Sequence, residues 1–392
     1  MNRMFIEPLD VLMFRSERPF TSRESHVAKV SIISPSIFDG AIKSKIFYDF
    51  CKNRGYSPTD FQRSKWENIK NFKKRICEKI KNDAELRRVL KVIGYPIMEG
   101  KPEILVRGVF FAIKQKYEEY FVMPNDIVKE DKDAYEKIKH GKSVNINPVK
   151  IEPKENINVN VNCGTPISVL VSKYLHVKKE EGFIHFNELK RYLEGEVPRE
   201  KVNAPFLKET RIGIRLEKNR KKTIEGYIYT AEFYRLLRSW GFIAWFEGTL
   251  DFMPKKGLIK LGGEGRGASF ERIDAKNLDF SDLIKEINEE GKFKLYLASP
   301  SLFNRGWHPP LQELKNLLGV EELKLVSSLP GKPVYIGGYN FALNMEKPLR
   351  KWINAGAVYY FKFKGNIRED VPNPIKILND NIEMRCGFIG RW

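Results

Sequence analysis

Cysteine and histidine are scarce in this chain, which has four cysteines and five histidines among its 392 residues. No two cysteines stand at CxxC spacing and no two histidines at HxH or HxxxH spacing, so the common zinc and redox motifs are missing. We therefore expect no metal and no cofactor. A secreted protein of this size usually carries a disulfide framework, which argues against secretion.

Long hydrophobic runs are missing as well. No apolar stretch approaches the roughly 18 residues of a membrane-spanning helix. The N-terminal segment reaches Arg3 and Glu7 too early for a signal peptide. A basic amphipathic helix at a terminus and a lipidation signal are also missing. These absences predict a cytoplasmic protein that does not bind a membrane.

Catalytic motifs are equally few, because neither GxSxG nor a Cys/His signature occurs. Metal-independent RNA cleavage would need an acid and a base near the 2′-OH, and His26 is the one tempting base. A hydrogen-bonding loop histidine is the favoured interpretation of His26. We therefore do not expect an enzyme.

Positive charge is abundant: 69 Lys and Arg against 50 Asp and Glu give a net charge of +19. This excess favours a polyanionic partner, because each phosphate contact releases condensed counterions. A thermophile surface rich in Lys and Glu is the alternative, but it does not require a large positive excess. With 42% hydrophobic residues, the chain can form the cores of about two domains. The composition thus indicates a folded nucleic-acid-binding protein.

Hydrophobic periodicity predicts an α+β fold with mainly antiparallel sheet. A helix is expected from Pro35 to Gly55, with Ser34 as its N-cap. Further helices are expected at 64–93 and 281–290. An insertion at 125–161 ends in a strictly alternating stretch, which suits an edge strand. Strands are expected at 4–15, 103–112, 120–123, 242–252, 258–261, 294–299, 334–336 and 356–364.

A hairpin is predicted from two β-prone arms, 210–216 and 223–230, joined by a basic tip at 217–222. The tip either tracks a polyanion or is a surface loop with random charge. A glycine-rich loop at 262–267 lacks the Walker A lysine and the surrounding βαβ unit of a dinucleotide site. It is either a tight strand connection or a loop that approaches an RNA backbone. Trp307 either stacks on a base or packs in the core, and the core is favoured.

Several short motifs occur in one order between residues 6 and 361. They include Ile6-Glu7-Pro8-Leu9-Asp10, Ser34-Pro35-Ser36, Gly262-Gly263-Glu264-Gly265-Arg266, Asn304-Arg305-Gly306-Trp307 and Gly337-Gly338-Tyr339-Asn340. Together they resemble the RAMP superfamily, and specifically the Cmr-type subunit of type III-B CRISPR effector complexes that holds the 5′ tag of the crRNA.

The resemblance implies two ferredoxin-like (RRM-like) modules with mainly antiparallel sheets. The first would span 1–235, with a helical insertion at 56–100, a loop and edge-strand insertion at 125–162, and a thumb hairpin at 210–230. The second would span 236–392 and carry the glycine-rich loop. The composition marks the boundary poorly, somewhere within 232–245.

The resemblance also implies a non-catalytic subunit that grips the crRNA tag and wedges the guide–target RNA duplex with its thumb. Its partners would be the crRNA, the target RNA, the large polymerase/cyclase-type subunit and a backbone RAMP subunit. Two other functions stay open. One is a metal-independent endoribonuclease that processes crRNA precursors with His26, and the other is a protein–protein scaffold without an RNA role.

The candidate RNA-binding residues are cations, hydroxyls, loop glycines and one stacking aromatic. The first loop and helix start supply Arg15, Arg18, Arg23, Lys29, Ser34, Ser36 and Lys43. The hairpin supplies Arg211, Arg215, Lys218, Arg220, Lys221 and Lys222. The glycine-rich loop supplies Gly262, Gly263, Gly265 and Arg266, and Trp307 is the stacking aromatic.

Overall fold

The computed structural model describes residues 1–14, 27–28, 33–130, 141–160, 166–172, 176–216, 223–249 and 251–392. They form an α+β fold in which every strand pairing is antiparallel except that of β2 with β14, so the predicted fold class is confirmed at this level. The helices of this part are α1 (Pro35–Arg54), η1 (Pro58–Phe61), α2 (Ile69–Lys81), α3 (Ala84–Val92), α4 (Phe186–Leu193), α5 (Ser281–Glu290) and α6 (Leu311–Leu318).

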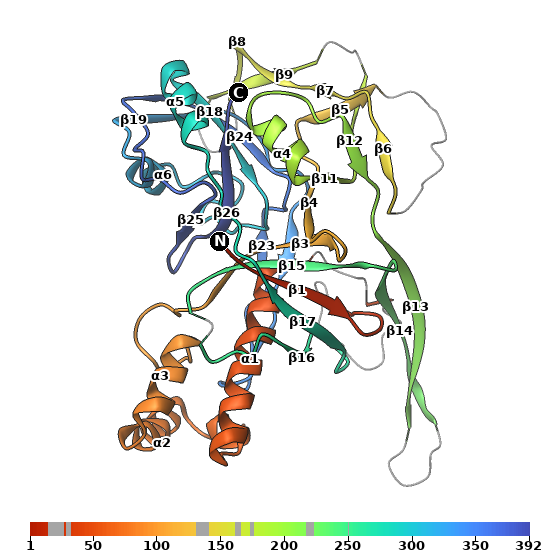
Figure 1. The fold of residues 1–392 in the computed structure, drawn as a ribbon, viewed down its shortest axis with the longest axis vertical. Coiled ribbons are helices and arrows are strands. Elements are labelled where there is room, and N and C mark those ends of the chain that lie inside the picture. Colours follow the sequence, from red (N-terminus) through yellow and green to blue (C-terminus); the bar gives the residue numbers. More distant parts are fainter. Residues whose placement is uncertain are drawn as a thin grey trace.

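A nine-stranded sheet forms the middle of the molecule (Figure 1). Its strands, from one edge to the other, are β16 (Lys256–Lys260), β17 (Gly267–Ile273), β1 (Asn2–Pro8), β15 (Trp240–Glu247), β3 (Leu105–Ile113), β4 (Glu118–Val122), β11 (Phe183–His185), β12 (Glu200–Val202) and β6 (Ser143–Asn145). The strand β1 therefore lies between two strands that come after residue 239.

A five-stranded sheet forms the second large element, in the order β19 (Glu322–Leu329), β24 (Val358–Lys364), β18 (Lys292–Leu297), β26 (Glu383–Gly390) and β25 (Ile375–Leu378). The strands β15 to β17 follow residue 236, yet β15 and β17 pair with β1 and β16 pairs with β17, so hydrogen bonding groups all three with the first sheet. The division of the chain at 235/236 remains a prediction.

Smaller sheets complete the structure. Two have three strands, β10 (Val177–Lys179) with β5 (Ile127–Glu130) and β7 (Val149–Lys150), and β13 (Phe206–Leu216) with β14 (Thr223–Leu236) and β2 (Val27–Ala28). Three have two strands, β8 (Glu152–Asn160) with β9 (Pro166–Val171), β20 (Val334–Ile336) with β23 (Arg350–Trp352), and β21 (Tyr339–Asn340) with β22 (Met345–Glu346). The described part of the alternating stretch, up to Asn160, thus belongs to a strand, β8.

The nine-stranded sheet is buried on both faces. Met4 and Phe242 pack with α1, α2 and α3 in one core cluster, whereas Phe5 and Trp245 pack with α4 and the five-stranded sheet in another. Side chains alternate between the faces because a strand repeats every two residues. Figure 1 shows the helical layer below this sheet and the five-stranded sheet above it.

Helix α1 forms as predicted. Phe38, Ile42, Ile46 and Phe50 are all buried on one stripe, and Gly55 ends the helix in a left-handed conformation with φ of 71°. Ser34 occupies the N-cap position, but its side chain makes no capping hydrogen bond to the backbone.

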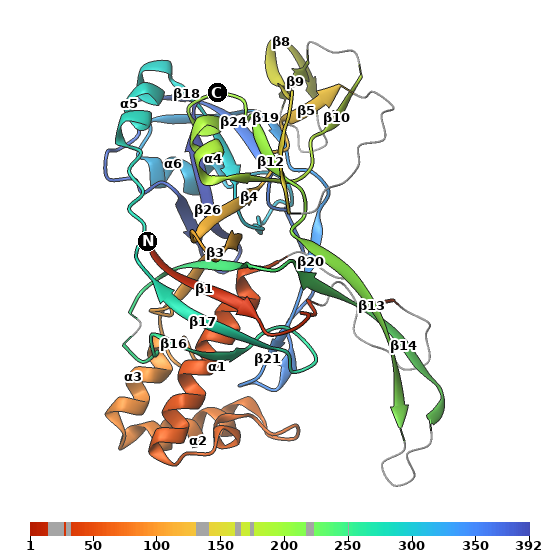
Figure 2. The ribbon, with the colours of Figure 1, turned by 45° about the vertical axis from the view of Figure 1, so that its right-hand side comes forward.

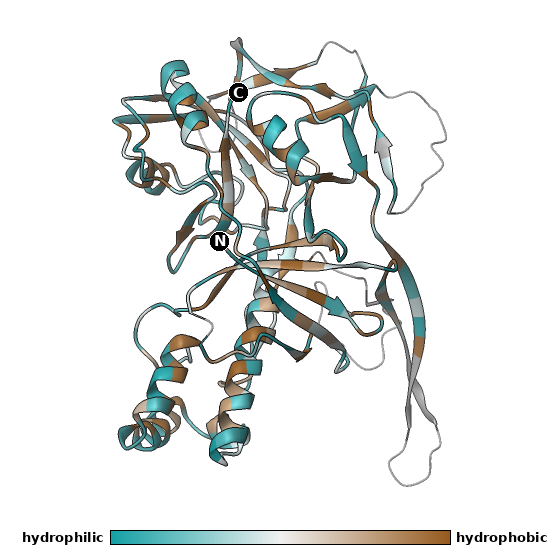
Figure 3. Ribbon diagram, viewed as in Figure 1, coloured by the Kyte–Doolittle hydropathy of each residue, from teal (hydrophilic) through white to brown (hydrophobic). Residues whose placement is uncertain are grey.

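The predicted helix over 64–93 is wrong, because two helices stand there. α2 ends at Lys81, and Asp83 starts α3 as an N-cap whose carboxylate accepts a hydrogen bond from the Leu86 N–H at 2.8 Å. A capping side chain competes with helix continuation, and this local competition decides the break. Hydrophilic and hydrophobic segments alternate along both helices (Figure 3).

Other predicted boundaries were also displaced. The strand expected at 4–15 ends at Pro8, which has no N–H to donate, and the strand expected at 242–252 ends at Glu247. Two helices of eight residues each, α4 and α6, were not predicted.

The predicted hairpin is present and longer than expected. β13 and β14 pair from Phe206↔Leu236 to Leu216↔Thr223, and both views show them leaving the body of the molecule (Figures 1 and 2). The basic tip, 217–222, lies outside the described residues. No helix in the described part of the chain combines the length and the apolar character that crossing a bilayer requires.

Candidate nucleic-acid interface

Three arginines from three separate segments meet at the root of the hairpin, around the carboxylate of Asp10. Arg211 comes from β13, Arg235 from β14 and Arg266 from the glycine-rich loop. Their guanidinium nitrogens lie 3.8, 3.4 and 3.3 Å from the Asp10 carboxylate oxygens. We call these four residues the arginine junction.

Backbone pairing brings the three segments together. Leu12, on the segment after β1, exchanges two hydrogen bonds with Tyr234 of β14, at 2.9 and 2.8 Å. The Gly263 N–H donates to the Met13 carbonyl at 2.8 Å. A Cβ at Gly262 would lie 2.5 Å from that carbonyl, and the φ of 77° there also favours glycine. The glycine-rich loop is thus a strand connection pressed against the opening segment.

The junction rests on a small apolar cluster made of Val11, Met13, Ala231 and Phe233. The guanidinium carbons of Arg211 and Arg266 lie 5.2 and 5.1 Å from the centre of the Phe233 ring, within the range of cation–π attraction. Phe233 is 4% exposed, so it fixes where both guanidinium groups can lie. The Arg266 Nε is buried without a hydrogen-bond partner among the described residues.

A second carboxylate, Glu209 of β13, shares two of the same arginines. Its oxygens accept hydrogen bonds from Arg211 and Arg235, each at 2.6 Å. These two hydrogen bonds lower the pKa of Glu209. The hydrogen bond between Arg235 and Glu209 in turn raises the pKa of Arg235. Three guanidinium groups therefore face two carboxylates, which leaves one positive charge in excess.

The junction can bind phosphate because its cations are partly open to solvent. The side chains of Arg211, Arg235 and Arg266 are 35%, 45% and 27% exposed. Guanidinium groups bind phosphate oxygens in the same bidentate geometry as carboxylates. A phosphate can therefore take the place of the shared Asp10 carboxylate without moving the arginines far.

The N-terminus of α1 adjoins the junction through Phe14. The Phe14 ring lies 5.9 Å from Phe38 of α1 and 6.0 Å from Tyr234 of β14. Ser34 is buried, and its hydroxyl lies 2.8 Å from that of Ser36. The structure therefore places this predicted pair on an element next to the junction.

Lys43 is engaged inside the protein. Its ammonium donates to Asp39 at 2.7 Å, and the same carboxylate accepts the Val106 N–H of β3 at 2.9 Å. Lys43 and Asp39 both belong to α1, so their ion pair lies within the helix, and it is Asp39 that ties α1 to the sheet. A phosphate contact by Lys43 would have to compete with that ion pair.

Trp307 belongs to the other half of the molecule. It is partly buried against the core that includes the five-stranded sheet, and its carbonyl accepts a hydrogen bond from Tyr359 at 2.8 Å. This placement agrees with the favoured interpretation of Trp307 as a core residue.

Many predicted residues cannot be placed. Arg215 lies in β13, but its side chain is outside the described part of the structure. Arg15, Arg18, Arg23, Lys29, Lys218, Arg220, Lys221, Lys222 and His26 also lie outside the described residues. The first of these segments starts directly after Phe14, and the hairpin tip joins the described ends of β13 and β14.

Two junction residues, Asp10 and Arg235, and two residues that contact the junction, Glu209 and Phe233, were missed as candidates from the sequence. The strand register contains the signal, because Glu209 pairs with Phe233 and lies diagonally opposite Arg235. The alternation of Ala231, Phe233 and Arg235 would also place these three on one face of β14.

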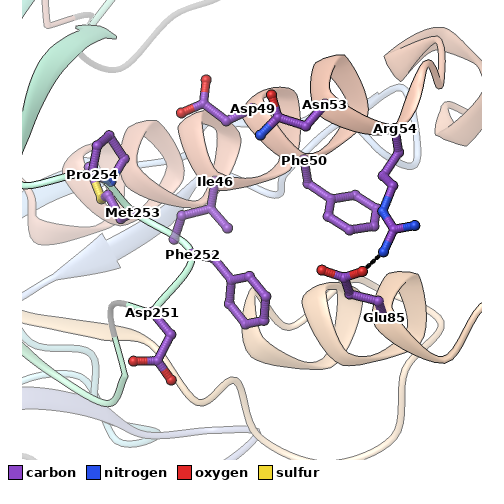
Figure 4. A pocket seen from close by; sticks show the side chains of 10 residues that line it. All are labelled: Ile46, Asp49, Phe50, Asn53, Arg54, Glu85, Asp251, Phe252, Met253 and Pro254. Atoms are coloured by element: carbon purple, nitrogen blue, oxygen red, sulfur yellow. Dashed lines mark ion pairs between the residues drawn. The ribbon is translucent and has the colours of Figure 1, made fainter.

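A cavity of about 320 Å³ opens between α1, α3 and the loop at 251–254 (Figure 4). Asp49, Glu85 and Asp251 line it, and each forms an ion pair with a basic side chain. The ten lining residues include no histidine, cysteine, serine or lysine. The lining therefore lacks a nucleophile with an adjacent base.

Two histidines of the described part of the chain have shifted pKa values, and metal-ligating side chains do not gather there. Burial lowers the pKa of His185 and of His308. No group of three or more histidine, cysteine, aspartate or glutamate side chains in this part of the chain could hold a metal ion.

Comparisons with known proteins give one family. The sequence matches the family described as CRISPR-associated protein (Cas_Cmr3) over residues 4–388. Two cryo-EM structures of the Type III-B Cmr-beta bound to cognate target RNA, one of them also with AMPPnP, contain a chain 16% identical to this one. Its TM-score is 0.42, and the similarity covers 91% of this chain and 86% of that one.

A chain in the apo state of the Type III-B Cmr-beta is 12% identical, with a TM-score of 0.29 and coverage of 70% of this chain and 97% of that one. No curated protein matches the sequence.

Proposed function

This chain belongs to the family of CRISPR-associated proteins described as Cas_Cmr3, and from that premise we propose that it is a non-catalytic RNA-binding subunit of a type III-B effector complex. It holds the 5′ tag of the crRNA. Its neighbours in the complex are the large polymerase/cyclase-type subunit and a backbone RAMP subunit.

The arginine junction is the observation that carries this proposal. Two of the predicted RNA-binding regions, the hairpin and the glycine-rich loop, are far apart in sequence and meet there around Asp10, which comes shortly before the first predicted loop. A single strand of RNA that lies along the junction can bind its phosphates to guanidinium groups that the protein already holds in position. Under this proposal the cations Arg15, Arg18, Arg23 and Lys29, which follow Phe14 in the sequence and lie outside the described residues, would also bind phosphates of the tag.

We further propose that the hairpin acts as the thumb. β13 and β14 are 11 and 14 residues long, so the hairpin can reach well beyond the body that anchors its root. With a basic tip it would wedge against the guide–target duplex. Lys218, Arg220, Lys221 and Lys222 would then contact phosphates of the paired strands.

Two ferredoxin-like modules are the matching proposal for the fold. The five-stranded sheet supports it, because β18, α6, β19 and β24 come in this order, with the short strands β20 to β23 inserted before β24. In the sheet, β18 lies between β24 and β26. The nine-stranded sheet is more elaborate, with β15 between β1 and β3. The helical insertion at 56–100 adds α2 and α3 to its outer face.

Crosslinking tests the proposal in the assembled complex. A crRNA that carries photoreactive nucleotides in its 5′ tag should label peptides that contain Arg211, Arg235 or Arg266. Labelling confined to other subunits would contradict it. A complex that assembles fully after removal of all RNA, with no crosslink to this chain, would favour a protein scaffold.

The double variant Arg235→Ala/Arg266→Ala gives the quantitative test. It should weaken tag binding. It should also make the slope of the logarithm of the binding constant against the logarithm of the salt concentration shallower, by about 0.7 for each phosphate of a single strand that the variant no longer binds. Lys364→Ala is the matched control, since Lys364 is an exposed lysine at the end of β24 with its own ion pair to Glu322. Equal affinity and equal salt slope in the junction variant and the control would exclude the junction from the RNA path.

A further inference from the structure

A second surface combines exposed aromatic side chains with exposed cations, away from the arginine junction. It consists of two segments. One is the strap, residues 334–352, which contains β20, β21, β22 and β23. The other is the α2 entry, residues 63–74, which leads into the first turns of α2. Figure 2 shows the strap running from the five-stranded sheet toward the helical layer.

The two segments are joined at Arg63. Its N–H donates to the Ala342 carbonyl at 2.8 Å, and its Nε donates to the Leu343 carbonyl at 2.8 Å. Ala342 and Leu343 also pack against the helical core, so the far end of the strap is fixed to the layer that carries α2. These contacts form one continuous surface from two distant parts of the sequence.

Large apolar side chains remain exposed on both segments. Trp66 of the α2 entry is 90% exposed, and Phe341 of the strap is 67% exposed. The Phe341 ring contacts that of Tyr339, itself exposed, with ring centres 5.3 Å apart. Exposing such aromatic side chains to water is unfavourable, and a bound partner would cover them. Their exposure on a fixed surface therefore indicates a binding site.

The charge of the surface identifies the chemistry of the partner. The strap has three exposed cations and one carboxylate, Glu346, and the α2 entry has four exposed lysines and one carboxylate, Glu67, which pairs with Arg75. None of these seven cations takes part in an ion pair among the described residues. They are Lys65, Lys70, Lys73, Lys74, Lys347, Arg350 and Lys351.

We propose that the strap and the α2 entry form a stacking platform for single-stranded nucleic acid, in which Trp66, Tyr339 and Phe341 stack on bases and the surrounding cations bind phosphates. Aromatic rings interleaved with exposed cations are the features that sequence-tolerant single-strand binding requires. The Lys65 ammonium already lies 5.4 Å from the centre of the Trp66 ring. This platform is a site separate from the arginine junction.

Tryptophan fluorescence tests the platform on the purified full chain. A 12-nucleotide oligouridylate should quench the emission, and Trp66→Phe should remove most of that quenching, because the other five tryptophans are buried or partly buried. Phe341→Ala should weaken binding at least about five-fold, as loss of one base-stacking ring does. Lys70→Gln/Lys73→Gln should reduce the salt slope by about 1.4 for two phosphate contacts.

Controls separate this site from the proposed tag site. Arg235→Ala/Arg266→Ala should keep the Trp66 quenching, and Trp66→Phe should keep crosslinks from the tag to the junction. Lys285→Gln, an exposed lysine on α5, should change neither. Unchanged affinity for the oligonucleotide in Phe341→Ala would overturn the platform. So would a photoreactive residue at position 341 that labels a protein subunit and no RNA in the assembled complex.

Discussion

Asp10 is a single carboxylate that organises three guanidinium groups without burying them. Ion pairs between partly exposed side chains contribute little to folding stability, typically below about 1 kcal/mol each. The contribution of Asp10 therefore lies in position: it keeps the arginines close together although they repel one another. The same negative charge competes with any phosphate that approaches.

Replacing Asp10 with Asn should separate these two effects. Asp10→Asn keeps the shape but removes the charge, so we expect RNA to bind several-fold more tightly at low salt. The free energy of unfolding should change by less than about 1 kcal/mol. Fluorescence anisotropy with tag RNA and urea unfolding measure the two quantities. Weaker binding would contradict the displacement of Asp10 by phosphate.

Lys294 makes a residue-scale prediction about pH. It is fully buried on β18, its ammonium donates to the Tyr192 carbonyl at 2.6 Å, and burial lowers its pKa from 10.5 to about 7, although Asp126 offsets part of the shift. Between pH 7 and pH 10 the unfolded chain holds this proton and the folded chain does not. The free energy of unfolding therefore rises with pH, by up to about 1.4 kcal/mol per unit from this group.

Urea unfolding at pH 7.5, 8.5 and 9.5 measures this dependence. Lys294→Met removes the titrating group, so its stability should rise less steeply with pH than that of the unaltered protein. Other lysines with lowered pKa values, such as Lys276, are present in both proteins and cancel in the difference. Parallel curves for the two proteins would show that Lys294 titrates normally.

At the scale of elements, the glycine-rich loop shows that two glycines in one turn can have different roles. Gly262 has a positive φ and faces the Met13 carbonyl, whereas Gly265 has a positive φ of 63° and open space around the position of a Cβ. An alanine at either position meets backbone strain of about 1 kcal/mol. An alanine at Gly262 also collides with the opening segment.

The pair Gly262→Ala and Gly265→Ala therefore makes a matched experiment. Gly262→Ala should be the more destabilising by at least about 1 kcal/mol, and it should weaken RNA binding because Arg266 shifts with the loop. Gly265→Ala should leave binding near that of the unaltered protein. Thermal unfolding and a tag-RNA titration give the comparison, and equal effects of the two variants would contradict the proposed contact.

Local sequence signals predicted many elements well. α1 was predicted because one stripe of apolar residues is bounded by Pro35 and Gly55, and α5 has the bounds that were predicted, Ser281–Glu290. The break between α2 and α3 was missed, since the apolar stripe continues across it and the cap of Asp83 is a single-residue signal. α4 and α6 were missed because eight residues give only two turns of periodicity.

The candidate site was predictable only in pieces. Arg211 and Arg266 were identified as basic residues near turns, but their meeting at Asp10 depends on β1, β14 and the glycine-rich loop becoming neighbours in space. No pattern within one segment reveals such long-range pairing. The strap was missed for the same reason, because its hydrogen bond with Arg63 joins residues 280 positions apart.

At the scale of the whole molecule, one core joins the two large sheets. The centre of the Phe388 ring, in the five-stranded sheet, lies 6.0 Å from the ring centre of Phe121 and 6.2 Å from that of Trp245, both in the nine-stranded sheet. Arg107 of β3 adds a buried link, donating to the carbonyl of Arg385 in β26 and to the Pro374 carbonyl, the latter at 3.0 Å. The two sheets should therefore unfold together.

Calorimetry of the full chain tests this coupling. We expect one transition, and Phe388→Ala should lower its midpoint as a whole, with a loss of about 3–5 kcal/mol from the removed ring. Hydrogen exchange should speed up in β3 and β24 alike. A second transition that stays at the original temperature in Phe388→Ala would show two independently stable halves.

The position of β1 also constrains how the protein is made. As the ribosome releases the nascent chain, β1 emerges long before its two hydrogen-bonding neighbours, β15 and β17, which are synthesised only after residue 239. For most of translation this apolar strand has two open edges, which invite pairing with other chains. Chaperone binding to the emerging strand, or rapid capture by partner subunits, would protect it until the sheet can close.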